Sequence, residues 1–288
     1  MSENNSSSVN KSNNVWALGS YNEFAIFILP VSAHLVKLCN ISAGYNVLDV
    51  ACGTGNTAIT AKRMVPDIKV TGIDFTPELL SQAKEQASIA DEGDIEWKEA
   101  NVEDLPFENE IFDVVFSSFG HMFAPHPQVA IKEMIRVIKP GGCIAFSTWP
   151  SELVNGKLFK AMAKYVPANT ENSIYLSNQS EQQQMLPSPM QWGNPEIIKR
   201  ILLDDLNKDA IKDIHFERGF VKIPVLSPNH YWTRTSTRSG PVIQAIQSIK
   251  DPSKIEALKK DVLQAIAPYY KDNELKLDYL ITMATKKK

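Results

Sequence analysis

The chain has 288 residues, and its 33 acidic side chains nearly balance its 30 lysines and arginines, leaving a formal net charge of −3. This balance argues against a broad electrostatic surface for nucleic acid. The most apolar stretch, Phe24–Cys39, is broken by Pro30, His34 and Lys37, so it is too short for a membrane helix of roughly 18 residues. Three widely spaced cysteines predict neither a disulfide framework nor a cysteine metal site. The polar N-terminus lacks the apolar segment of a signal peptide. We therefore expect a cytoplasmic protein without an integral membrane segment, a metal or a nucleic-acid partner.

Residues 46–150 alternate short β-rich runs with longer amphipathic segments. The runs are Asn46–Val50, Ile68–Asp74, Ile95–Glu99, Phe112–Ser117 and Cys143–Thr148. The helical candidates between them are Thr57–Val65, Pro77–Ala90 and Gln128–Ile138, and a turn is predicted at residues 139–142. This alternation predicts an α/β protein with a Rossmann-like, doubly wound sheet that is covered by helices on both faces.

The regions on either side of this core are less regular. Residues 1–14 have the composition of a disordered tail, and residues 15–45 are expected to form an N-terminal helical cap. In residues 151–288, the polar segment 167–192 predicts a loop insertion, and helices are expected from residue 194 to about 206 and in pieces between 229 and 270. Residues 213–225 and 275–284 are strand candidates that complete a mostly parallel, seven-stranded sheet as its edge. The remaining segments are expected to form a lid over the substrate.

A glycine-rich turn follows the first predicted strand. Gly53 and Gly55, with Ala58 in the third position, match the nucleotide-binding fingerprint at the start of a helix. Asp74 ends the second strand 21 residues after Gly53, where a carboxylate accepts hydrogen bonds from ribose hydroxyls. A tight strand–helix turn without a ligand is the alternative, but the loop and the acid occur together at the expected spacing.

The loop alone does not distinguish NAD from S-adenosylmethionine. Asp49 lies four residues before Gly53, where its charge would repel the anionic pyrophosphate of a dinucleotide. S-adenosylmethionine carries a positive sulfonium and a positive ammonium and no phosphate. Asp49 therefore favours S-adenosylmethionine.

The segment Val47–Ala58 resembles the first motif of class I S-adenosylmethionine-dependent methyltransferases, and three further segments match in order. They are residues 72–77, residues 101–107, and residues 112–119 together with 138–142. The chain is most similar to the ubiquinone/menaquinone-biosynthesis-like members (methyltransferase domain type 11), chiefly over residues 15–150. The resemblance implies a cofactor site made by Tyr21, Asp49, Ala51, Gly53, Gly55, Asp74, Phe75, Asn101, Val102 and Ser117.

Within that implied site, each part of the cofactor has expected neighbours. Asp74 would bind the ribose and Phe75 would pack on the adenine. Asn101 stands where the family often has aspartate; its amide oxygen still accepts a hydrogen bond from the adenine amino group but adds no charge. The backbone N–H of Val102 would face the ring. Tyr21 would reach the carboxylate end of the cofactor, although simple packing is an equal alternative.

Methyl transfer is an in-line displacement, so the protein needs a base only if the acceptor must lose a proton. His121 follows the fourth strand, at the edge of the sheet where α/β proteins bind ligands, and is the first candidate for a catalytic base. His230, beside Tyr231 and Trp232, is the second. A structural role for each histidine is the alternative.

These features predict a methyltransferase that acts on a small, apolar or aromatic organic molecule. Its lid segments contain the apolar residues Phe119, Met122, Phe123, Trp149, Tyr231 and Trp232, which suit an uncharged acceptor. An NAD(P)-dependent oxidoreductase and a non-catalytic S-adenosylmethionine-binding module are the two alternatives. The sequence does not identify the acceptor atom or the oligomeric state.

Overall fold

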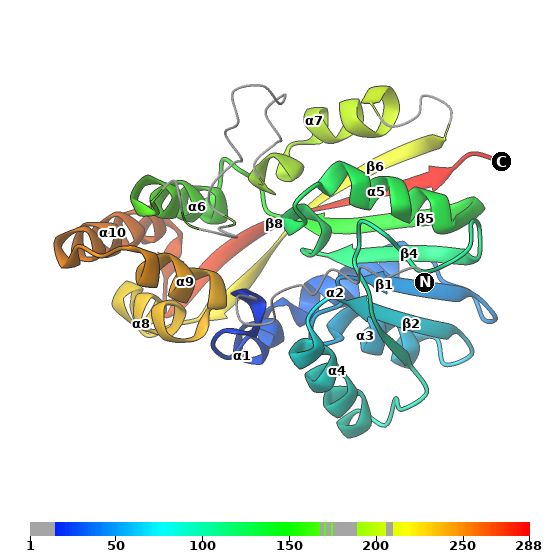
Figure 1. The fold of residues 1–288 in the computed structure, drawn as a ribbon, viewed down its shortest axis with the longest axis horizontal. Coiled ribbons are helices and arrows are strands. Elements are labelled where there is room, and N and C mark those ends of the chain that lie inside the picture. The colour runs from blue at the N-terminus through cyan, green and yellow to red at the C-terminus, as the bar shows by residue number, and fades with distance from the viewer. Residues whose placement is uncertain (1–14, 168–169, 171–173, 175–188, 206–209) are drawn as a thin grey trace, which may run out of the picture.

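The computed structural model describes residues 15–167, 170, 174, 189–205 and 210–288 (Figure 1). The predicted tail, residues 1–14, and most of the predicted loop insertion at 167–192 lie outside these residues. Among the described helices, none is long and apolar enough to cross a membrane.

One sheet organises the fold, with strand order β3-β2-β1-β4-β5-β8-β6. The strands are β3 Glu96–Glu99, β2 Lys69–Asp74, β1 Asn46–Val50, β4 Phe112–Ser118, β5 Ile138–Thr148, β8 Glu274–Lys286 and β6 Ile211–Pro224. Neighbours from β3 to β5 pair in parallel, whereas β8 runs antiparallel to both β5 and β6. The two-residue strand β7, Tyr270–Lys271, adds to β8. The predicted Rossmann-like, mostly parallel sheet is confirmed, including the return of its last two strands to the edge.

Helices cover both faces of the sheet because successive strand residues point to opposite sides. On one face, Val47 of β1 and Phe116 of β4 pack with α2 Leu29–Leu38, α3 Asn56–Met64 and α4 Pro77–Ile89. On the other face, Leu48 and Val115 pack with α5 Pro127–Val137 and α7 Pro195–Arg200. The alternating runs in the sequence therefore become two separate cores.

A third, smaller core lies at one end of the molecule. It joins helices α6 Val154–Tyr165, α8 Pro228–Arg238, α9 Gly240–Ser248 and α10 Pro252–Ile266. Figure 1 shows this helical cluster beside the far ends of the long strands β6 and β8. The short helix α1, Asn22–Ala25, lies between the cluster and the main sheet. The N-terminal segment is attached to the cluster, because the Ser20 N–H donates to the Arg238 carbonyl at 2.9 Å and Arg238 pairs with Glu23.

Two local predictions need correction. The segment after α5 is not a free turn: β5 already starts at Ile138, which pairs with Phe112. The register then jumps to Val114 opposite Cys143, and the extra residues form a bulge in which Gly141 has φ +81°. Glycine tolerates this conformation, so the pair Gly141-Gly142 serves a bulge rather than a strand boundary. Helix α6 was not predicted, although Val154, Leu158 and Met162 recur at the spacing of one helix face.

Candidate functional site

The glycine loop connects the end of β1 to α3 at the carboxyl edge of the parallel sheet. Its backbone has positive φ at Ala51 (+52°), Gly53 (+55°) and Gly55 (+81°). A Cβ at Gly55 would lie 2.6 Å from the Trp97 ring, so only glycine fits there. The Cys52 N–H donates to the Ile73 carbonyl at 2.8 Å and joins the loop to β2. The loop is therefore a tightly wound turn in a fixed position.

Asp74 lies beside this loop because the parallel register pairs Val50 with Ile73. One carboxyl oxygen accepts the Gly53 N–H at 2.9 Å, and the other accepts the Thr76 N–H at 2.9 Å. The residue is buried, and burial raises its pKa despite these hydrogen bonds. The Thr76 side chain and the Phe75 N–H also donate to this carboxyl group, so a ribose hydroxyl expected from the sequence would share its oxygens with these donors.

Asp49 is the second buried carboxyl group, on β1 below the loop. Its Oδ2 accepts the Ala58 N–H at 2.9 Å, whereas Oδ1 has no hydrogen-bond partner among the described residues. Burial raises the pKa of Asp49 to about 7, opposed by the Ala58 hydrogen bond and reinforced by the charge of Asp74. A buried carboxyl oxygen without a partner destabilises the fold, and a hydrogen bond from a cationic ligand group would offset this cost.

A small polar cavity of about 30 Å³ adjoins Asp49 and the loop. Its lining includes Tyr21, Ala25, Ile28, Ser32, Asp49, Ala51, Cys52, Gly53, Thr54, Asn56, Thr57 and Ser118. The predicted residues Tyr21, Asp49, Ala51 and Gly53 are thus brought together. Gly55 does not line the cavity and instead caps α3.

Ser117 differs from its predicted place. It is fully buried, and its hydroxyl accepts the His121 N–H at 2.9 Å. The next residue, Ser118, points to the opposite side of β4 and lines the small cavity instead.

The predicted adenine end lies along the strand ends from β2 to β3. Phe75 is 47% exposed, so its ring is open to a ligand. Val102 is buried, and Asn101 Oδ1 accepts the Glu103 N–H at 3.0 Å, which leaves this oxygen one more lone pair. An exposed ring would suit a flat ligand, and the roles of Phe75 and Asn101 at the adenine stay predictions.

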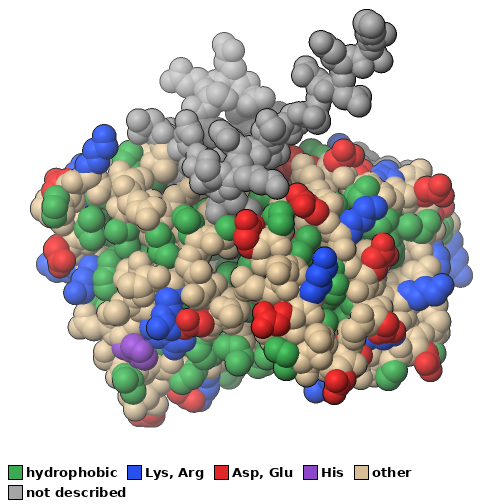
Figure 2. All heavy atoms as spheres, turned by 60° about the horizontal axis from the view of Figure 1, so that its bottom comes forward, with side chains coloured by type: hydrophobic (Ala, Val, Ile, Leu, Met, Phe, Trp, Pro, Cys, Tyr) green, Lys and Arg blue, Asp and Glu red, His purple; other side chains and the backbone are tan. Residues whose placement is uncertain are grey.

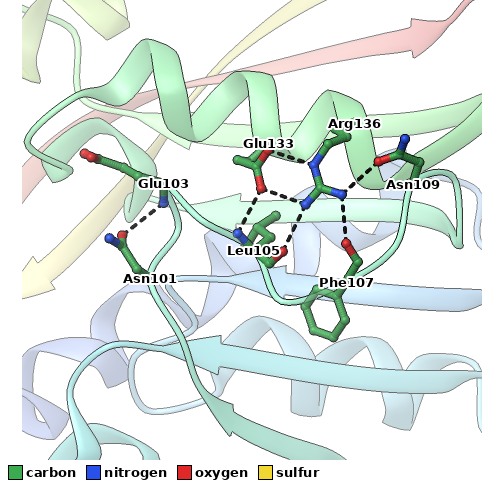
Figure 3. Close-up of polar contacts among 7 residues, drawn as sticks. All are labelled: Asn101, Glu103, Leu105, Phe107, Asn109, Glu133 and Arg136. Carbon is green, nitrogen blue, oxygen red and sulfur yellow. Dashed lines mark hydrogen bonds and ion pairs between the residues drawn. The ribbon is translucent and has the colours of Figure 1, made fainter. Parts of the chain in front are cut away.

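Figure 3 shows a clamp on this loop that the sequence analysis did not identify. The Arg136 guanidinium donates to the Leu105 carbonyl at 2.9 Å and to the Phe107 carbonyl at 2.8 Å. Glu133 accepts the Leu105 N–H at 2.9 Å and pairs with Arg136, which holds the pKa of Glu133 below its usual range. The spacing of Glu133 and Arg136 on one helix face was the available signal, but it did not indicate that their partner was a loop.

Replacing Arg136 with methionine should weaken cofactor binding without removing any ligand contact. Residues 101–107 would lose two of their anchors and would have to be ordered on binding, at a cost of about 1 kcal/mol or roughly fivefold in Kd. Calorimetry with S-adenosylhomocysteine measures this change. Lys132→Met, at an exposed position of the same helix, is the matched control and should bind like the parent; equal affinities of the two variants would contradict the clamp.

A second, larger cavity of about 240 Å³ borders the first and shares Tyr21 and Ile28 with it. Its lining comes from the N-terminal segment, from the ends of β4 and β5, and from the helical cluster. The aromatic members are Trp16, Tyr21, Phe24, Phe119, Phe123, Trp149, Phe159, Tyr231 and Trp232. Five of the six apolar lid residues predicted from the sequence line it; Met122 is the exception, because it is fully buried in the core under α5.

The two predicted catalytic histidines do not line either cavity. His121 is fully buried between Phe146 and Trp192, with ring centroids 4.5 Å and 5.0 Å away, and burial lowers its pKa to about 3. His230 Nδ1 accepts the Leu226 N–H at 3.0 Å at the start of α8, so this nitrogen is already used in a local hydrogen bond. Proximity in sequence to the fourth strand did not reveal that the His121 side chain turns into the core.

Burial of His121 has a measurable effect on stability. The folded-state pKa lies well below the ordinary value of 6.5, so the unfolded chain binds a proton that the native chain does not. The His121 contribution to stability should therefore fall as pH drops below about 6.5, by up to about 1.4 kcal/mol per pH unit. Asp49, whose pKa burial raises to about 7, contributes the opposite trend over the same range. Urea unfolding of the parent and of His121→Phe at pH 7.5 and 5.5 separates the two contributions, because Asp49 is common to both proteins, and the parent should lose stability relative to the variant at the lower pH. The same pH dependence in both proteins would show that His121 is protonated in the native state.

Comparisons with known proteins identify the family. A family model described as a methyltransferase domain matches residues 47–142. The chain is 32% identical over 275 residues to the Mycobacterium tuberculosis protein named "Uncharacterized protein Rv1403c", covering 94% of this chain and 93% of that one. It is 36% identical over 134 residues to the demethylmenaquinone methyltransferase of Listeria monocytogenes, covering 46% and 56%. The solved structure of YcgJ from Bacillus subtilis matches with a TM-score of 0.58 at 16% identity, covering 90% and 99%.

The chain belongs to the class I S-adenosylmethionine-dependent methyltransferases, as the sequence motifs predicted. It is an enzyme of that family, and neither the oxidoreductase nor the non-catalytic alternative is favoured. S-adenosylmethionine is the cofactor of this class, and the residues at the carboxyl edge fit it. The unpaired Asp49 oxygen suits a cationic group, and the glycine loop offers a close backbone approach.

Proposed function

We propose that this enzyme transfers a methyl group from S-adenosylmethionine to a small, neutral and largely apolar organic molecule held in the 240 Å³ cavity. The strongest support is the composition of the cavity wall. Among its described lining residues, none is Lys, Arg, Asp, Glu or His. An ion would lose its hydration there without gaining a partner, whereas an apolar or aromatic molecule gains contacts.

In this proposal the cofactor lies along the carboxyl edge of the sheet with its methionine end towards the small cavity, and the acceptor lies in the larger cavity. Asp74 binds the ribose, Phe75, Asn101 and Val102 surround the adenine, and Asp49 faces the methionine end. When bound, the cofactor supplies an electrophilic methyl group and its own leaving group. Tyr21 and Ile28 line both cavities, which supports transfer at their junction.

The protein's contribution is positioning and the exclusion of water. Burial raises the pKa of both Tyr21 and Tyr231 to about 12, so neither hydroxyl serves as a base near neutral pH. With no histidine or carboxylate in the described wall of the larger cavity, we infer an acceptor whose reacting atom is nucleophilic when it enters.

An activity screen tests the proposal. The enzyme is incubated with S-adenosylmethionine labelled in the methyl group and with cell-extract metabolites separated into neutral and charged fractions. Label should appear in the neutral, organic-extractable fraction. Met162→Trp, which fills the larger cavity, should abolish transfer and still bind S-adenosylhomocysteine. Transfer confined to charged molecules would contradict the proposed acceptor class, and transfer to nothing would favour a non-catalytic protein.

A further inference from the structure

One polar atom in the larger cavity lacks a partner. Asn155, the second residue of α6, lines the cavity, and its amide nitrogen Nδ2 is buried without a hydrogen-bond partner in the described part of the chain. Amide N–H groups are strong donors, and leaving one buried and unpaired costs folding free energy. Such a group in a cavity suggests that its partner is the molecule that fills the cavity.

The surrounding backbone fixes the position of Asn155. The next residue, Gly156, is buried, and a Cβ there would lie 2.0 Å from the Ser151 carbonyl oxygen. The residue before it, Val154, is fully buried in the main core. The first turn of α6 is thus packed directly against the segment that follows β5, so Asn155 is held on a rigid element.

Thr235 gives a contrast within the same wall. Its hydroxyl donates to the Tyr231 carbonyl at 2.9 Å and to the Trp232 carbonyl at 3.1 Å, so its proton is already used inside α8. Asn155 Nδ2 carries two donor hydrogens that serve no such internal role.

We propose that Asn155 positions the methyl acceptor by donating a hydrogen bond from Nδ2 to an oxygen or nitrogen lone pair of the acceptor. The inference rests on the proposed function, since it takes the larger cavity as the acceptor site. It adds that the acceptor is a neutral molecule with an apolar skeleton and at least one carbonyl, ether, hydroxyl or ring-nitrogen acceptor atom. Asn155 is then a specificity-determining residue, because an analogue without that atom would leave the amide unpaired.

Two probes with the same carbon skeleton test this role. Acetophenone carries a carbonyl oxygen, and ethylbenzene does not. Calorimetry on the full chain saturated with S-adenosylhomocysteine gives the ratio of their Kd values for each variant. Asn155→Leu should shift that ratio about tenfold towards ethylbenzene. Asn155→Asp, which presents acceptor oxygens in place of the amide donor, should shift it the same way.

Lys160→Met, at an exposed position of the same helix and outside the cavity wall, is the matched control, and its Kd ratio should equal that of the parent. Retained binding of S-adenosylhomocysteine shows that a variant is folded. An unchanged ratio in a folded Asn155→Leu protein would overturn the assignment of Asn155. Tighter binding of benzoate than of acetophenone, or no binding of either neutral probe, would overturn the proposal that the acceptor molecule is neutral. Failure of the parent protein to bind S-adenosylhomocysteine would instead count against the proposed function.

Discussion

Replacing Asp74 with alanine should lower the affinity for S-adenosylhomocysteine about 100-fold or more, as measured by calorimetry. Two effects add in the same direction. The proposed ribose hydroxyls would lose two hydrogen bonds to a carboxylate, each worth about 1.5–3 kcal/mol. The N–H groups of Gly53 and Thr76 would also lose the oxygens that hold them at 2.9 Å. The glycine loop would then be less ordered before the ligand arrives.

Two further variants separate these effects. Asp74→Asn keeps one carbonyl oxygen for a loop N–H and should give an intermediate affinity. Glu78→Gln removes an exposed carboxylate four residues away and should bind like the parent. If Asp74→Ala bound S-adenosylhomocysteine as well as Glu78→Gln does, the cofactor would not lie at the end of β2. Tight binding of NADH by the parent would also contradict the assignment of this site to S-adenosylmethionine.

The second large effect concerns pH and Asp49. Its folded-state pKa of about 7 lies above the ordinary value of 3.8, so much of the free enzyme carries a proton on Asp49 below pH 7. A cationic ammonium beside the unpaired Oδ1 favours the ionised form, so binding must release that proton at low pH. Affinity for S-adenosylhomocysteine should therefore rise by up to about tenfold from pH 6 to pH 8.

Asp49→Asn isolates this contribution, because any titration of the ligand itself is common to both proteins. The variant should bind more weakly than the parent at pH 8, by about tenfold, and its affinity should change little with pH. The amide also keeps an oxygen for the Ala58 N–H, so the helix start is preserved. A parallel pH dependence in the two proteins would show that Asp49 does not face the charged end of the cofactor.

The charge distribution on the visible surface matches the near-neutral composition. On the face in Figure 2, basic and acidic side chains are interspersed and do not gather into one basic patch. This face therefore offers no electrostatic attraction for an anionic partner, which agrees with the neutral acceptor that we propose.

Local patterns in the sequence were sufficient to predict the central part of the sheet. The strands at 46–50 and 112–118, the helix start at Pro77 and the glycine loop all depend on short-range preferences of the backbone. Asp49, Ala51 and Gly53 were found together because they are nearly adjacent in sequence. Asp74 followed from the known geometry of parallel strands, in which consecutive β-α units meet at one edge.

The lining of the larger cavity, where we propose that the acceptor binds, could not be predicted in this way. Tyr21, the pair Trp149 and Asn155, and Tyr231 come from three segments separated by more than 70 residues, and they meet only because β6 and β8 carry the helical cluster beside the N-terminal segment. Whether a given histidine faces a cavity or the core depends on packing around it, as His121 between Phe146 and Trp192 shows.

The sequence by itself thus determined the class of enzyme, its cofactor and the position of the glycine loop, because these depend on backbone turns and on the chemistry of near neighbours. The tertiary structure alone decided the larger apolar cavity, the clamp from Arg136 and the unpaired amide of Asn155. Those features depend on long-range packing, and long-range packing leaves no local pattern in the chain.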